Sequence, residues 1–87
     1  MKYLCIECTN SETGEISSVL FNLAHAATIG VRYHTDRNCY VLQAGDISDT
    51  EVWILAEGTR DHCIALMNQI FLLIKSPSRH ILDIRQS

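Results

Sequence analysis

One short stretch limits the folds open to this chain more than any other: residues 51–58, Glu-Val-Trp-Ile-Leu-Ala-Glu-Gly. Its apolar side chains alternate between two sets, one with Val52 and Ile54 and the other with Trp53 and Leu55. Alternation with a period of two is typical of a β-strand, and apolar residues in both sets predict a strand covered on both faces. The chain is therefore predicted to be built around a central strand.

Two other stretches have the spacing of amphipathic helices. Residues 11–28 carry apolar side chains three and four positions apart, and Thr9 with Glu12 fits a capping box at their start. Residues 60–75 show the same spacing, and Pro77 prevents the helix from continuing. The chain is therefore predicted to contain two helices that flank strands.

The order of these elements predicts the fold. Strands are expected at residues 2–8, 39–44, 51–58 and 80–85, and residues 31–34 are either a further strand or the approach to one. We predict a single α+β domain over residues 1–87, a ferredoxin-like βαββαβ two-layer sandwich. In that fold an antiparallel sheet carries both helices on one face and leaves its other face open.

Composition argues against two classes of partner. The formal net charge is −3 and the basic residues are scattered, whereas a nucleic-acid binder needs clustered Lys and Arg. No run of about 18 apolar residues is present, so no membrane span is expected. The start of the chain lacks the pattern of a secretory signal, so its four cysteines are interpreted as thiols of a cytoplasmic protein.

The open sheet face is the predicted site of association. A hydrophobic content of 47% is more than one thin core hides easily in 87 residues, which favours a homodimer or a protein partner. If Val52 and Ile54 point under the helices, the other set of side chains lies on the open face. The predicted interface residues there are Tyr3, Cys5, Tyr40, Trp53 and Leu55. Leu66 and Leu73 on the second helix form an alternative interface, because the apolar arc of that helix is wide.

No catalytic, metal or cofactor site is predicted. Cys5 and Cys8 have C-x-x-C spacing, but within a strand residues three apart point to opposite faces, which does not suit a shared metal ion. His62 and Cys63 are adjacent in the chain, and adjacent residues of a helix do not face each other. These residues are therefore expected to be structural.

A local pattern near the C-terminus resembles a known family. Glu57-Gly58 after a strand, a helix, and Arg79-His80 before a final strand resemble flavin-binding blue-light sensors of the BLUF type. The flavin-contacting Tyr and Gln of that family correspond here to Glu7 and Ile54, which cannot replace them. The resemblance therefore implies the order of elements and neither flavin nor light sensing.

The leading functional hypothesis is a small non-enzymatic interaction or regulatory module, such as an inhibitor, that binds a protein partner as a homodimer. One alternative is a sensor that binds a small molecule or nucleotide between Tyr3, Tyr40 and Trp53 at the sheet face or dimer interface. A second alternative is a small cysteine- or histidine-dependent enzyme that uses Cys5 or Cys63.

Overall fold

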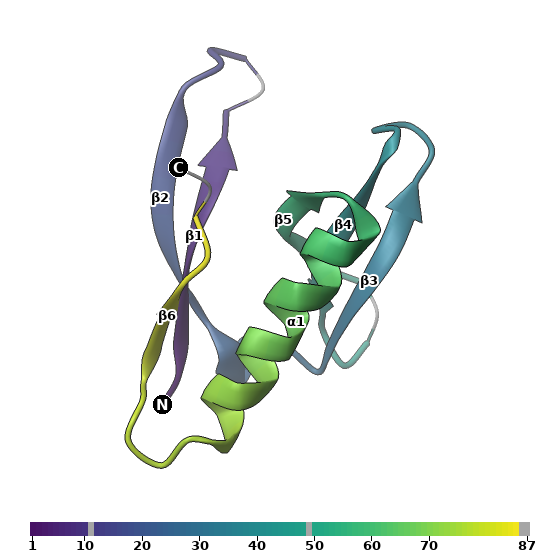
Figure 1. Cartoon of the computed structure of the whole chain (residues 1–87). Helices are drawn as coiled ribbons and strands as arrows, with labels where there is room; N and C mark the ends of the chain where they lie inside the picture. Colours follow the sequence, from purple (N-terminus) through teal and green to yellow (C-terminus); the bar gives the residue numbers. More distant parts are fainter. Residues whose placement is uncertain (11, 49, 86–87) are drawn as a thin grey trace.

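A computed structural model describes residues 1–10, 12–48 and 50–85 and shows a mostly β fold with one α-helix in that part of the chain (Figure 1). The elements are β1 (Tyr3–Thr9), β2 (Ile16–Asn22), the 3-10 helix η1 (Leu23–His25), β3 (Thr28–His34), β4 (Cys39–Gly45), β5 (Val52–Gly58), α1 (Arg60–Lys75) and β6 (Ile81–Asp83). The predicted ferredoxin-like βαββαβ sandwich is wrong, because the described residues form one long helix and two small sheets.

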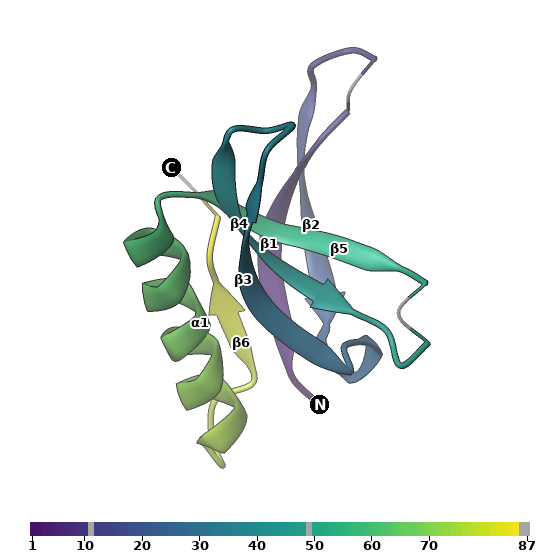
Figure 2. The same cartoon turned by 90° about the vertical axis from the view of Figure 1, so that its right-hand side faces the viewer.

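The strands are divided between two three-stranded sheets. One has the order β2-β1-β6, in which β2 is antiparallel and β6 parallel to β1. The other is the antiparallel series β3-β4-β5. The sheets meet where β1 contacts β5, and α1 packs against β3, β4, β5 and β6 (Figure 2).

Most of the expected strands are confirmed in place. β1, β4 and β5 match the predicted strands to within one residue at each end, and residues 31–34 are the second half of β3. The last strand, β6, is shorter than residues 80–85. Local alternation is thus a reliable guide where a strand is well covered.

The predicted first helix over residues 11–28 is wrong. The Asn10 side-chain oxygen accepts a hydrogen bond from the Glu12 amide, and Gly14 adopts a left-handed φ of 73°. This geometry closes a hairpin between β1 and β2. Side chains such as Asn, Ser and Thr accept hydrogen bonds from backbone amides both in turns and at helix starts. The residues that fit a capping box, Thr9 and Glu12, therefore lie at the end of β1 and in the turn that follows it, and not at the start of a helix.

The following residues form a strand because β1 provides a partner along their whole length. β2 pairs with β1 from Thr9 opposite Ile16 to Tyr3 opposite Asn22. Its sequence, Ile-Ser-Ser-Val-Leu-Phe-Asn, is rich in residues with weak helix propensity. Pairing with β1 therefore prevails over an apolar spacing that a helix would also satisfy.

The predicted second helix is confirmed as α1. The Thr59 hydroxyl accepts from the His62 amide at 3.1 Å, and Asp61 lies in the first turn near the positive end of the helix dipole. The Ser76 amide donates to the carbonyls of Leu72 and Leu73 and closes the other end. Neither α1 nor any other described helix is long and apolar enough to cross a membrane.

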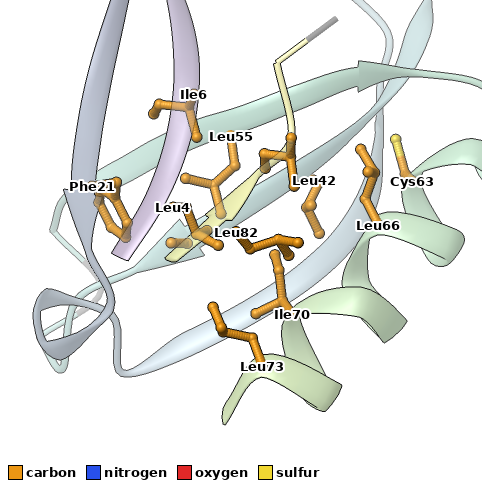
Figure 3. Packing of buried hydrophobic residues seen from close by; sticks show 12 residues of the cluster. Leu4, Ile6, Phe21, Leu42, Leu55, Cys63, Leu66, Ile70, Leu73 and Leu82 are labelled. Carbon is orange, nitrogen blue, oxygen red and sulfur yellow. The ribbon is translucent and has the colours of Figure 1, made fainter. Parts of the chain in front are cut away.

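The hydrophobic core lies between the two sheets and α1 (Figure 3). Its buried members are Leu4, Ile6, Phe21, Leu42, Ala44, Leu55, Cys63, Leu66, Ile70, Leu73, Leu82 and Ile84. Side chains from β1, β4, β6 and α1 converge on one volume, so each element depends on the others for burial.

The faces of β5 are the reverse of the predicted ones at residues 52–55, whereas Ala56 packs against the core on the side predicted for it. Leu42 pairs with Ala56 and the next residue of β4 pairs with Ile54, so a β-bulge lies at Leu55. Leu55 is 3% exposed, whereas Val52 is 50% exposed. The bulge shifts the alternation along the strand, which a regular period of two does not anticipate.

Adjacent residues of α1 provide a matched test of this core. Leu73→Ala removes a side chain that is 0% exposed and should lower the free energy of unfolding by about 2–5 kcal/mol. Leu72→Ala, at a side chain 58% exposed, should change it by less than about 0.5 kcal/mol. Urea denaturation measures both, and equal effects would contradict the orientation of α1.

Candidate protein-interaction surface

The five residues predicted to share an open sheet face do not form one surface. Tyr3 and Cys5 belong to one sheet, whereas Tyr40, Trp53 and Leu55 belong to the other. Leu55 is buried in the core. The other four residues are half-buried, two in each sheet. These residues therefore form no broad shared aromatic face.

Two of these aromatic rings pack within the chain. The indole of Trp53 meets the ring of Phe21 edge to face, with ring centres 5.5 Å apart. Tyr40 packs against Tyr33 in the same manner at 5.1 Å. Such contacts stabilise the fold, and they give Trp53 and Tyr40 each a ring partner within the chain.

The alternative interface on the second helix is also displaced. Leu66 and Leu73 are buried and face the core, because the stripe that contains them is the one that meets the sheets. The exposed apolar side chains of α1 are instead Phe71, Leu72 and Ile74. Phe71 and Ile74 line a shallow apolar groove of about 290 Å³ beside Ile29 of β3.

The cysteines do not form a recognisable reactive centre. All four are free thiols, and no group of three or more metal-ligating side chains is found among the described residues. Cys8 is exposed and Cys5 is half-buried, so neither is a fully buried core residue. Burial raises the pKa of the Cys63 thiol, with smaller contributions from Cys39 and Glu57, so Cys63 is held in its protonated, weakly nucleophilic form.

A charged cleft of about 390 Å³ lies at the junction of β1 and β5, with residues of the 35–38 turn and the C-terminal segment at its rim. Two arginines line it. Arg37 forms an ion pair with Glu57, and the Arg85 guanidinium donates to Asp83 at 2.7 Å. Both cations already have carboxylate partners, so an anionic ligand would have to compete with those carboxylates.

Arg85 also attaches the C-terminal segment to β2. Its guanidinium donates to the Ser18 hydroxyl at 3.1 Å as well as to both carboxylate oxygens of Asp83. These hydrogen bonds to Arg85 lower the pKa of Asp83 to about 2, and Asp83 raises the pKa of Arg85 in return. The outer face of the first sheet is thereby held together across its three strands.

β2 is the most exposed strand of the molecule and lies at the edge of its sheet (Figure 1). Ile16, Val19 and Leu20 are 63%, 40% and 58% exposed. No charged residue and no proline occurs in its seven residues. Edge strands are normally protected from pairing by charge, proline, a bulge or short length. β2 has none of these protections: its seven residues are uncharged, lack proline and pair with β1 without a register shift.

The backbone N–H and C=O groups of successive residues of β2 point alternately toward β1 and away from it. The Tyr3 amide bonds to His80, and the Cys5 carbonyl accepts from Ile84, so these two residues turn their backbone groups toward β6. Their partners across the ladder, Asn22 and Leu20, are therefore non-hydrogen-bonded to β1.

The same alternation gives the open positions of the edge. Ser17, Val19 and Phe21 bond to β1, whereas the amides and carbonyls of Ser18 and Leu20 point outward. No described strand pairs with β2 on that side. An extended segment of another chain would find both donors and acceptors along this edge.

Comparisons with models of protein families, with curated proteins and with solved structures found no match to this chain.

Thiol reactivity tests the placement of the cysteines. In the folded protein, iodoacetamide at pH 8 should modify the exposed Cys8 at least about tenfold faster than Cys63, since reaction requires both access and thiolate. Mass spectrometry of digested samples gives the rate at each site, with urea-unfolded protein as the control. Rapid modification of Cys63 in the folded state would contradict its burial.

The ion pair at the C-terminal segment makes a prediction about pH. Because the folded pKa of Asp83 is lowered from 3.8 to about 2, its contribution to stability is present above pH 4 and is lost as pH falls toward 2. Side-chain carboxyl shifts in an NMR titration should show this midpoint. In Arg85→Ala, which keeps the backbone amide bond to Asp83, the midpoint should move toward 3.8, and an unchanged value would exclude the Arg85 side chain as the main cause.

Proposed function

We propose that this chain is a small non-enzymatic protein-interaction module that binds an extended segment of a partner as an additional strand along β2. The observation that supports this proposal is an uncharged seven-residue edge strand with three exposed aliphatic side chains. Addition of a strand to such an edge gains affinity from main-chain hydrogen bonds and specificity from alternate side chains.

The other sheet edges of the described chain are less suited to this role. β3 contains Arg32, β5 contains Glu57, and β6 has only three residues, one of which is Asp83. Charged side chains on an edge and short edges both oppose strand addition. Chain pairing is therefore directed to β2.

An enzymatic role has weaker support. Cys63, one of the two predicted nucleophiles, is a buried thiol with a raised pKa. Cys5 lies half-buried on a strand. Cys63 therefore lacks the exposure and the lowered pKa of an activated cysteine. The four free thiols support a reducing, cytoplasmic setting for the proposed interaction.

Site-specific photocross-linking tests the proposal. A benzoylphenylalanine in place of Ser18 should form an adduct with a protein partner in extracts of the producing cells, whereas the same group in place of Ser78, in an exposed loop, should not. Leu20→Pro removes an outward amide without removing a hydrogen bond to β1. It should reduce the adduct about tenfold, the effect of about 1.4 kcal/mol of lost ladder bonding.

Leu72→Lys is the control, because it places a charge on an exposed helix position away from β2. It should leave the adduct unchanged, and circular dichroism should show that both variants are folded. Equal adducts from the two photoreactive positions, or an adduct unaffected by Leu20→Pro, would overturn strand addition at β2.

A further inference from the structure

We infer that the strand that completes β2 is β2 of a second copy, paired antiparallel about a twofold axis at Val19. The inference rests on the proposed function, since it uses the same edge, and it adds the identity and register of the occupant. Twofold symmetry requires each copy to present the same patch, and an antiparallel strand pair meets this requirement.

The direction of the backbone groups restricts the register. The outward groups lie at even-numbered positions of β2, so outward positions of one copy must face outward positions of the other. With the axis at Val19, Ser18 faces Leu20 of the second copy and Ile16 faces Asn22. All seven residues of β2 are then paired, whereas an axis at Ser18 or Leu20 pairs only five of them.

The side chains are also compatible with this register. Val19 meets its own copy at a non-hydrogen-bonded position, where the Cα atoms are about 4.5 Å apart and side chains are close. Leu20 lies diagonally across from Ile16 of the second copy, within reach of an apolar contact. The three most exposed aliphatic residues of β2 thus gain apolar neighbours together.

Charge does not oppose a second copy, although the net charge of the chain is −3. β2 itself carries no charge, and the carboxylates nearest to it along the chain are Glu12 and Glu15 in the preceding turn. Antiparallel pairing places the two acidic turns at opposite ends of the paired strands, about 24 Å apart for seven residues. Screening at physiological salt makes repulsion over that distance small.

Light scattering on the purified chain is the first test. The chain should have the mass of a dimer at high micromolar concentration and dissociate on dilution. Leu20→Pro, or Leu20→Glu as a second variant that keeps the amide, should weaken the dimer at least about tenfold, and Leu72→Lys should not. A dimer that persists unchanged in both Leu20 variants would overturn the inference.

Oxidative cross-linking tests the register. In a background with Cys5, Cys8 and Cys39 replaced by Ser, the thiols of Val19→Cys should form an interchain disulfide, because their Cα atoms lie within bonding range. The thiols of Ser18→Cys should not, since that position and its copy are separated by about 8 Å in this register. The opposite pattern would overturn the axis at Val19.

The outcomes separate the inference from the proposed function. The purified chain could be monomeric at several hundred micromolar while benzoylphenylalanine in place of Ser18 still cross-links a different protein, with less adduct in Leu20→Pro. That result would exclude the second copy and leave strand addition standing. If the chain is monomeric and no such adduct forms, both are overturned.

Discussion

The contact of α1 with both sheets is the interaction on which the rest of this structure depends. Leu4 of β1, Leu42 of β4 and Ile70 of α1 are each at most 1% exposed, and they meet in one cluster. Neither three-stranded sheet has enough apolar surface to be stable alone, so each needs the helix and the other sheet. Figure 3 shows side chains of α1 reaching toward those of the strands.

A single helix covers this core only in part, and β2 is the strand left outside its cover. Phe21 reaches the core near one end of β2, whereas Ile16, Val19 and Leu20 remain exposed. Such a strand is aggregation-prone in a monomer unless it has a specific partner. Under the proposed function this exposed edge is the binding site, and a symmetric pair of β2 strands would protect it in every copy.

The chemistry of the remaining surface is consistent with this interpretation. Arg37 and Arg85 are each engaged by a carboxylate, and Arg85 joins the C-terminal segment to Ser18 of β2. Of the four cysteines, Cys63 is the most buried, and its thiol packs in the hydrophobic core.

The sequence alone determined the elements whose signals are local. Alternation over residues 39–45 and 52–58 and the capped, proline-terminated pattern over residues 60–75 produce the strands and helix that local physics predicts. Only the tertiary structure decided that residues 16–22 form a strand, because their apolar spacing suits both forms and pairing with β1 selects one.

The tertiary structure likewise decided which side of β5 is buried, since the bulge at Leu55 exists only through pairing with β4. The candidate site, the open edge of β2, is likewise set by strand pairing in the tertiary structure. An edge strand is defined by what lies beside it, and strand neighbours far apart in the chain leave no periodic signal in the sequence.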